Sequence, residues 1–408
     1  MTITASAAAR LAWGLLAALL LIVPAAARAS DAEILARLNA EQRRHYEAYR
    51  KARATFDAKL ERYWSAVDAK RAERRRKRSA GMALAPDNYV REHPPKYAGL
   101  TLRPGIAKIA AAIKPPRPDS PLPTLRDFLL NAKKHYGFVP QTVGEREFKR
   151  RYAEEAVALG LSKEQVIRVY ALETGGRGTY DMQAGIDPET KRGTAISSAL
   201  GYAQLLHANS VNELVNHGDG FLTRLRAIAA AAGADSQRAR ELAAKAAVVR
   251  AMLAVARSVP NEWGAQVRLA ATPKGLGIHV LNLDADLGPW LQVVKLRGLK
   301  DEAARAGRAS LSGAEIELMN LAGPRTGLEM MEPAGRGAPT ANFFSQTAYA
   351  RNPIVRDRTA GELLKAIGER MDASAGKPGA VEFAKVFDEV LRQRARTAGG
   401  VAEANSSP

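Results

Sequence analysis

The 408-residue chain contains no cysteine. This absence excludes disulfide bridges, thiolate zinc sites, cysteine nucleophiles and lipid attachment through cysteine. Aromatic residues make up only 6% of the chain, yet 46% of its residues are hydrophobic and 25% are charged, which is typical of a globular protein rather than a disordered one. The length allows roughly two to three domains.

Acidic residues are fewer than basic ones. The chain has 42 Asp+Glu against 61 Lys+Arg, so its formal net charge is +19. Such an excess favours an anionic partner: nucleic acid, anionic lipid or an acidic polymer. The sequence lacks an HExxH helix, a phosphate-binding loop, a dinucleotide fingerprint and a G-x-S-x-G nucleophile elbow. We therefore predict neither a metal nor a cofactor.

The first 29 residues indicate an exported protein. Arg10 is followed by an apolar run from Leu11 to Val23, which fits the core of a signal peptide and is short for a membrane span. Because Ala27-Arg28-Ala29 fits the small-x-small pattern of a cleavage site, we predict a signal peptide over 1–29 with cleavage after Ala29. The alternative is an uncleaved N-terminal membrane anchor.

Export changes the ranking of the anionic partners. In either case the rest of the chain is expected in the periplasm or outside the cell, where nucleic acid is scarce. We therefore predict no nucleic-acid partner and favour cell-wall polymer or an anionic membrane surface. A nucleic-acid-binding function would require the export prediction to be wrong.

Residues 30–79 have the pattern of one long, basic, amphipathic helix. Neither Gly nor Pro occurs over 31–78, and apolar residues recur at helical spacings close to a heptad. That stripe is compatible with helix-mediated self-association. The helix ends in the basic block Lys70 to Arg78, which is either a solvated helix end or a contact with an anionic envelope surface.

The next region, residues 80–123, is rich in proline. Nine of the 21 prolines lie between Pro86 and Pro123, a density that excludes a regular helix or a central strand. We predict a semi-rigid linker here, with a helical turn at Ile106 to Ile113.

From residue 124 onward the pattern is helical, so the predicted fold class is mainly α. Ser162 with Gln165, and Ser312 with Glu315, form capping boxes ahead of apolar periodic runs. Helical periodicity lapses between residues 177 and 194, where two short strands around a turn are expected. We predict one domain over 124–372 and, over 373–408, a C-terminal helix (Ala380 to Arg396) with a disordered tail.

Glu173 is the most informative residue of this domain. It lies in the last turn of the helix that starts after Ser162, and Gly175-Gly176 end that helix. Its spacing from Val169 and Tyr170 directs it toward the core, and a negative charge at a helix C-terminus opposes the helix dipole. Burial and the dipole both disfavour the carboxylate, so we expect a raised pKa and a general-acid role. The alternative is a helix-end Glu that turns to solvent.

Two further segments carry polar residues at unusual positions. Ser197 to Leu206 fits a short helix that contains Gly201, where a close approach of a ligand or backbone is expected, and Gln204 on the same face. Asn320 lies in the last turn of the helix that starts after Ser312 and ends at Gly323-Pro324. The aromatic residues of the segment Asn342 to Pro353 either line a groove or belong to the core.

These segments together carry a family resemblance. Glu173-Thr174, then Ser198, Ala199, Gly201 and Gln204, then Asn320, Gly323 and Pro324 resemble, in that order, the motifs of the lysozyme-like domain of soluble lytic transglycosylases. The resemblance covers roughly residues 140–330 and implies a lysozyme-like α+β domain with one small β-hairpin. Met319 stands where the family has Tyr, so we expect Tyr170, Tyr180 or Tyr202 to support Glu173 instead.

The resemblance implies a reaction and a substrate. Peptidoglycan glycan strands would be cut between N-acetylmuramic acid and N-acetylglucosamine, with Glu173 as the single general acid and base. Ser198, Gly201, Tyr202, Gln204 and Asn320 would bind the sugars. A hydrolase would need a second carboxylate, for which Asp181 and Asp187 are candidates. The alternative function is a non-catalytic wall-binding or scaffolding protein on the same fold.

Overall fold

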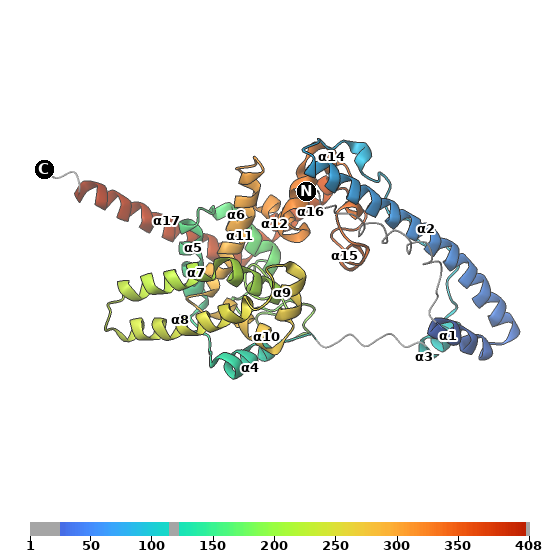
Figure 1. The fold of residues 1–408 in the computed structure, drawn as a ribbon, viewed down its shortest axis with the longest axis horizontal. Helices are drawn as coiled ribbons and strands as arrows, with labels where there is room; N and C mark the ends of the chain where they lie inside the picture. The colour runs from blue at the N-terminus through green and yellow to red at the C-terminus, as the bar shows by residue number, and fades with distance from the viewer. Residues whose placement is uncertain (1–24, 114–121, 405–408) are drawn as a thin grey trace, which may run out of the picture. The chain divides into compact units, whose positions relative to one another are not determined.

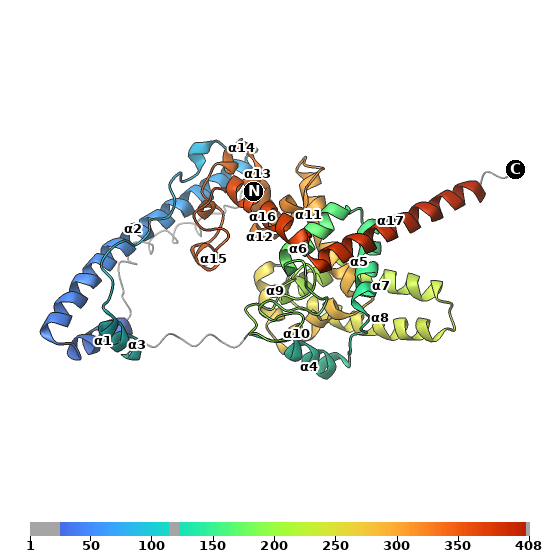
Figure 2. The same cartoon turned by 180° about the vertical axis from the view of Figure 1, so that it is seen from behind.

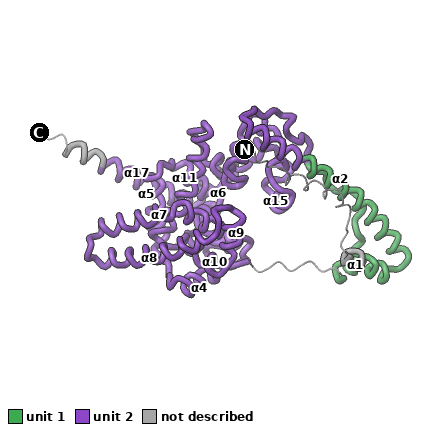
Figure 3. Tube along the Cα trace, viewed as in Figure 1, with its two compact units in different colours: residues 1–66, 94–120 green, residues 67–93, 121–408 purple. Residues whose placement is uncertain are grey.

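The computed structural model describes residues 25–113 and 122–404, and these residues are mainly helical (Figure 1). The predicted fold class of mainly α is therefore confirmed. The chain divides into two compact units: Met1–Ala66 with Pro94–Ser120, and Val67–His93 with Pro121–Pro408 (Figure 3). The predicted signal-peptide core, Leu11 to Val23, lies outside the described residues. Within the described ranges, no helix combines the length and the apolar character that a membrane crossing requires.

The first unit contains α1 (Ala25–Ala36), the first part of α2 (Ala40–Ser79) and α3 (Pro104–Ile113). Ile34, Leu38, Tyr46 and Ile106 form its small apolar cluster. The prediction of one unbroken helix over 31–78 is wrong, because a second helix begins after Asn39.

The cause of this break is a reciprocal cap at the start of α2. The Asn39 side-chain oxygen accepts a hydrogen bond from the Gln42 backbone N–H (2.9 Å), and the Gln42 side-chain oxygen accepts one from the Asn39 N–H (3.0 Å). This is the arrangement of a capping box, in which the first residue starts a new helix. Gln42 interrupts the apolar stripe because it satisfies a helix end.

The region predicted as a linker is partly packed. Residues 86–88 form a short 3-10 helix, η1 (Pro86–Asn88), and Asn88 and Tyr89 are only 1% and 2% exposed. The helical turn expected at Ile106 is the helix α3, which starts two residues earlier with Pro at its first position. Residues 114–121, at the centre of the predicted linker, lie outside the described part.

The basic block at the end of α2 is not simply solvated. Arg74 is 1% exposed, and its guanidinium contacts Glu329 (Nε to Oε1, 2.6 Å) and the backbone oxygens of Asn88 and Asn342. Arg78 also pairs with Glu329. The heptad-like spacing does not distinguish a buried arginine from a solvated one in this block. The partner that buries Arg74, Glu329, lies some 250 residues away in the sequence.

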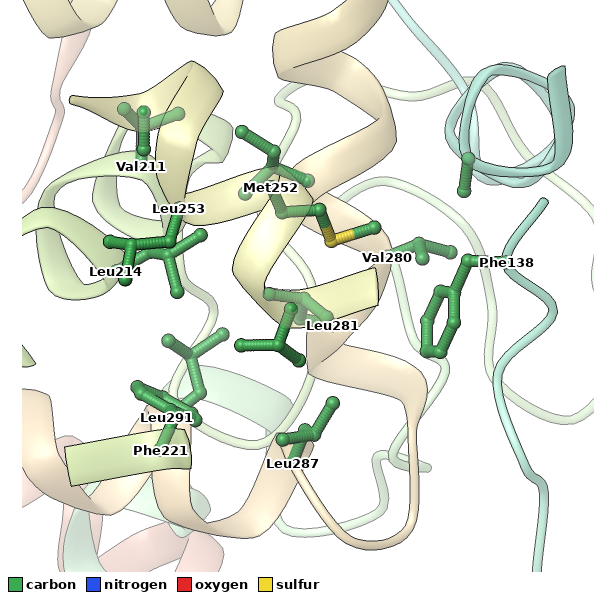
Figure 4. Packing of buried hydrophobic residues seen from close by; sticks show 14 of the residues in the cluster. Phe138, Val211, Leu214, Phe221, Met252, Leu253, Val280, Leu281, Leu287 and Leu291 are labelled. Atoms are coloured by element: carbon green, nitrogen blue, oxygen red, sulfur yellow. The ribbon is translucent and has the colours of Figure 1, made fainter. Parts of the chain in front are cut away.

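The second unit carries the remaining helices (Figure 2). Buried side chains of α4, α7, α8, α9, α10, η2 and α11 form a large apolar core in this unit. Figure 4 shows the part of this core where side chains of α7, α8, η2 and α11 meet. The helices are α4 (Leu125–Tyr136), α5 (Glu145–Ala158), α6 (Lys163–Thr174), α7 (His207–Ala231), α8 (Gln237–Ala256), α9 (Trp263–Ala270), α10 (Pro273–His279), η2 (Val280–Leu283), α11 (Gly288–Arg305), α12 (Gly313–Ala322), α13 (Pro324–Met331), α14 (Pro333–Arg336), η3 (Thr340–Asn342), α15 (Gln346–Arg351), α16 (Ala360–Ala375) and α17 (Pro378–Ala404).

Local sequence signals fix the starts of α6 and α12, the helices that carry Glu173 and Asn320. Ser162 and Gln165 cap α6 reciprocally, and Ser312 and Glu315 cap α12 in the same way. Both predicted capping boxes are confirmed. The C-terminal helix α17 extends beyond its predicted end at Arg396, to Ala404.

The segment between α6 and α7 contains turns and isolated antiparallel bridges. Ile186 pairs with Gly193, and Leu200 pairs with both Gln183 and Leu205. In the described residues these bridges do not extend into strands, so the predicted hairpin is present only as single pairings. The short helix expected over 197–206 is also absent: these residues form a turn, and α7 begins at His207.

Candidate active site

Glu173 lies in the last turn of α6, at the edge of the buried side of this helix. Val166, Val169 and Tyr170 are each 1% exposed, which fixes the rotation of α6 about its axis. Glu173 follows on the same side and is partly buried. Gly175 then ends the helix in a left-handed conformation with φ of 62°. The sequence pattern correctly predicted this position of Glu173.

The partners of Glu173 come from α12. The side-chain amide nitrogen of Asn320 lies 3.4 Å from Glu173 Oε1. The same nitrogen lies 3.4 and 3.5 Å from the two carboxylate oxygens of Glu317. One amide therefore holds two carboxyl groups from different helices, Glu173 on α6 and Glu317 on α12.

This arrangement shifts the pKa of both carboxyl groups. Burial, followed by the charge of Glu317 and a hydrogen bond with it, raises the pKa of Glu173 well above the ordinary value. Burial raises the pKa of Glu317, while its hydrogen bonds with Glu173 and Asn320 and the charge of Lys295 lower it. The net result is a pKa of about 7. Two close carboxyls cannot both ionise cheaply, so the pair holds on to a proton at a pH where an ordinary glutamate has lost its own.

Glu317 is the residue of this cluster that the sequence pattern did not single out. It lies three residues before Asn320, so both side chains share one face of α12. It also stands inside the apolar run of α12 and is 5% exposed. A charged residue in a buried stripe was the available signal, but its partner Glu173 lies 144 positions earlier, at the end of another helix, and no local pattern connects the two.

Two consecutive glycines fix the backbone directly after Glu173-Thr174. Both are left-handed, with φ of 62° at Gly175 and 70° at Gly176. A Cβ on Gly175 would meet nothing within 4 Å, whereas a Cβ on Gly176 would collide with the backbone oxygen of Ser374. The Gly176 oxygen in turn accepts a hydrogen bond from Ala380 N (3.1 Å). The end of α6 is thus packed closely on the connection between α16 and α17.

This difference predicts unequal effects of two neighbouring substitutions. Gly175→Ala should lower the free energy of unfolding by about 1–2 kcal/mol, the cost of a left-handed alanine. Gly176→Ala should cost roughly 1–3 kcal/mol more, because the added methyl overpacks a backbone contact. Urea denaturation followed by circular dichroism measures both values. Equal losses in the two variants would contradict the close packing at Gly176.

Gln204 organises the loop and does not reach the carboxyl pair directly. Its amide donates hydrogen bonds to the backbone oxygens of Gly201 (2.7 Å) and Met182 (3.2 Å), and its φ is 41°. Gly201 is left-handed, and a Cβ there would lie 2.5 Å from the side-chain nitrogen of Gln292. The close approach predicted at Gly201 is therefore made by Gln292, a buried residue of α11.

Ser198 and Tyr202 are buried inside the same loop. Ser198 is 4% exposed, and its hydroxyl lies 2.5 Å from Nδ1 of His207. Tyr202 is 1% exposed, and its hydroxyl donates to Glu145, the first residue of α5. These interactions hold the loop in place, so neither side chain is presented to a ligand in this structure. Of the residues predicted to bind sugar, the structure brings Asn320 to Glu173.

The substitutes expected for the family Tyr at Met319 are engaged elsewhere. Tyr170 donates its hydroxyl hydrogen to the backbone oxygen of Gly178 (2.7 Å), Tyr202 donates to Glu145, and Tyr180 stacks on Phe148. Met319 itself is fully buried. The side chains that form hydrogen bonds with Glu173 include Asn320 and Glu317.

The second-carboxylate candidates Asp181 and Asp187 have other partners. Asp181 is paired with Lys191 (3.0 Å). Asp187 accepts hydrogen bonds from the Thr190 backbone and hydroxyl, which lower its pKa, as a turn residue does. Both side chains are thus engaged within the 181–191 loop, and the carboxyl that shares the Asn320 amide with Glu173 is that of Glu317.

A pocket of about 570 Å³ lies between α4 and the 181–191 loop. Its walls include Leu125, Leu129 and Met182, with the Asp181–Lys191 ion pair alongside. Met182 connects it to the loop described above, because its backbone oxygen accepts the Gln204 amide. Glu173 does not line this pocket.

The aromatic residues of the segment Asn342 to Pro353 belong to the core. Phe343, Phe344 and Tyr349 are each 7–8% exposed. Asn342 is fully buried and holds the backbone of Val90 through both its amide nitrogen (2.8 Å) and its oxygen (2.9 Å). These residues therefore do not line a groove in the described structure.

A second buried glutamate predicts a pH-dependent stability. Glu213 on α7 is 5% exposed, and burial raises its pKa from the ordinary 4.5 to about 7. Between these two values the folded chain binds more protons than the unfolded chain, so the free energy of unfolding falls as the pH rises. Glu213→Gln should therefore be more stable than wild type at pH 8, by up to about 3 kcal/mol, and equal to it at pH 4.

The comparison is made by urea denaturation at both pH values. Glu369→Gln on α16 is the matched control, since Glu369 is 64% exposed and lies on the surface beside Lys365. A Glu213→Gln variant with the same stability difference at pH 4 and pH 8 would contradict the raised pKa.

No protein-family model matches this chain, and a match was found neither among curated proteins nor among solved structures.

Proposed function

We propose that this protein is an exported lytic transglycosylase that cleaves the MurNAc-GlcNAc bonds of peptidoglycan. The observation that supports it best is the cluster at the end of α6. There Asn320 holds Glu173 beside Glu317, and burial together with that second carboxyl raises the pKa of Glu173. A carboxylic acid that stays protonated near neutral pH is what protonation of a glycosidic oxygen requires.

In the proposed reaction, Glu173 gives its proton to the glycosidic oxygen and the N-acetyl group of the muramyl sugar stabilises the positive centre. Glu173, now a carboxylate, takes the proton of the muramyl C6 hydroxyl, whose oxygen closes a 1,6-anhydro ring. Because no water enters, the two fragments together contain the same atoms as the starting glycan strand. Asn320 fixes the carboxyl of Glu173 through its amide.

The spacing of the carboxyl groups favours this lyase over an inverting hydrolase. An inverting enzyme keeps its two carboxyls roughly 6.5–9.5 Å apart, so that a water fits between the base and the sugar. Glu173 and Glu317 instead share the amide of Asn320 and a hydrogen bond. Glu317 is therefore not placed to activate a water on the opposite face of the sugar.

The same proposal includes the location and the anionic partners. Export through residues 1–29 would bring the chain to the cell wall. In the basic block, Arg75 and Arg76 are exposed on α2, while Arg74 is buried. The exposed pair would contact an anionic envelope surface, and self-association through α2 is compatible with its length.

The alternative function, a non-catalytic wall-binding or scaffolding protein, is favoured by one observation. Met319 replaces the family Tyr, and the tyrosines expected to substitute for it are engaged elsewhere. If Asn320 and Glu317 do not replace that hydroxyl in function, the chain would bind glycan without cutting it.

Product analysis separates these functions. The purified chain is incubated with peptidoglycan sacculi, and the soluble fragments are measured by mass spectrometry. We expect 1,6-anhydro-muropeptides. Fragments with reducing ends would show a hydrolase, and sacculi that bind the protein but release nothing would show the non-catalytic alternative.

A further inference from the structure

Glu317 is more deeply buried than Glu173 in this cluster. Glu317 is 5% exposed, whereas Glu173 is partly exposed. A bound glycan could therefore touch Glu173 but not Glu317. Whatever Glu317 does in a reaction, it must do through its neighbours Glu173 and Asn320.

We propose that Glu317 is a positioning residue for the reaction: held with Glu173 on the amide of Asn320, it keeps the proton on Glu173 before the bond is cut and draws a proton back to Glu173 afterwards. The inference rests on the proposed function, because it assigns a role within that site. It goes beyond the family resemblance, which assigns nothing to this position.

The geometry supports this role in two ways. The distances from the Asn320 amide nitrogen to the nearest carboxylate oxygen of Glu173 and of Glu317 are both 3.4 Å, so the two groups are held by one donor. The two carboxyls come from different helices, α6 and α12, each fixed at its start by a capping box. The pair is therefore set by the fold rather than by flexible side chains meeting on a surface.

The charges on the helices packed against α12 leave this pair with little compensation. Lys295 on α11 is the cation whose charge acts on Glu317. Two carboxylates on neighbouring helices are already bound to cations: Glu329 on α13 by Arg74 and Arg78, and Asp372 on α16 by Arg168.

The charge balance explains both halves of the reaction. Before cleavage Glu173 is protonated and Glu317 carries the negative charge. When the proton moves to the leaving oxygen and the glycosidic bond breaks, the pair carries two negative charges faced by Lys295. Repulsion between them makes Glu173 a stronger base, which takes the proton from the C6 hydroxyl as its oxygen bonds to the anomeric carbon. Glu173 then ends protonated, as it began.

The test is the pH profile of Glu317→Gln, which keeps the size of the side chain and removes the charge. Without that charge Glu173 should lose its proton at lower pH. We expect the alkaline limb of kcat/KM for muropeptide release to move down by about one pH unit or more. A carbon-13 NMR titration of glutamate carboxyls in the full chain should show the same shift for the Glu173 signal, which is identified by its loss in Glu173→Gln.

Two further variants make the result decisive. Lys295→Met leaves both carboxyls in place and should move the titration of the pair upward, because it removes the cation that lowers the pKa of Glu317. The surface variant Glu369→Gln should leave profile and titration unchanged. Unchanged midpoints in both Glu317→Gln and Lys295→Met would overturn the inference. If the wild type releases no muropeptides, the proposed function fails, and the NMR titration still decides the coupling.

Discussion

Glu173→Gln should release muropeptides at least about a thousandfold more slowly than wild type while remaining folded. Glutamine has the shape of glutamic acid and can still meet the Asn320 amide, but it has no proton to give and cannot take one back. Both halves of the proposed reaction pass through this carboxyl, so no other residue of the cluster replaces it. Glu317 is 5% exposed and cannot reach the glycosidic oxygen.

The loss is measured as the rate of fragment release from sacculi, with the circular dichroism spectrum and the urea midpoint as checks of folding. Glu369→Gln provides the control for replacing a glutamate, and it should release fragments at the wild-type rate. Release by Glu173→Gln at the wild-type rate would refute the assignment of the acid. In that case the raised pKa of Glu173 would have no role in the reaction.

Local rules correctly predicted the part of the site that lies on α6. The capping box at Ser162 gives the start of the helix, the buried spacing of Val166, Val169 and Tyr170 gives its rotation, and Gly175 gives its end. All of these signals act within about one to four turns of a helix. The position of Glu173 at the edge of the core followed from them.

The partners of Glu173 could not be predicted in this way. Glu317 and Asn320 meet Glu173 because α12 packs on α6, and the distance along the chain between these helices exceeds a hundred residues. The turn at Gly201 was also misjudged, because its left-handed conformation and the approach of Gln292 are properties of the folded loop. Helical spacing describes a face but does not identify what covers it.

The cluster also has a cost that fits a functional site. A carboxyl with a raised pKa favours its neutral form, so Glu173 and Glu317 oppose folding when the pH rises above the pKa of the pair. Replacing such groups by neutral side chains of the same shape would be expected to stabilise the chain. A fold that keeps two of them on one amide carries a destabilising feature that packing alone does not require.

Arg74→Met should lower the free energy of unfolding by about 3–5 kcal/mol, the usual loss when one member of a buried ion pair is removed. Arg74 is 1% exposed, and Glu329, with which it pairs at 2.6 Å, has a side chain that is 4% exposed. The same guanidinium donates to the backbone oxygens of Asn88 (3.0 Å) and Asn342 (2.8 Å), and it lies 4.4 Å from the centre of the Tyr89 ring. Methionine fills part of the space but satisfies none of these acceptors.

Two variants turn this loss into a test of the basic block. Arg76→Met changes an exposed residue two positions along α2 and should stay within about 0.5 kcal/mol of wild type. Adding Glu329→Gln to Arg74→Met should recover part of the loss, since the carboxylate no longer needs a cation. Urea denaturation gives the free energies, and hydrogen exchange over residues 67–93 and 329–344 locates the change. Equal, small effects of Arg74→Met and Arg76→Met would show that the whole block is solvated. A large effect at Arg74 alone assigns it to the core, and leaves the exposed arginines as the part of the block that can contact an anionic surface.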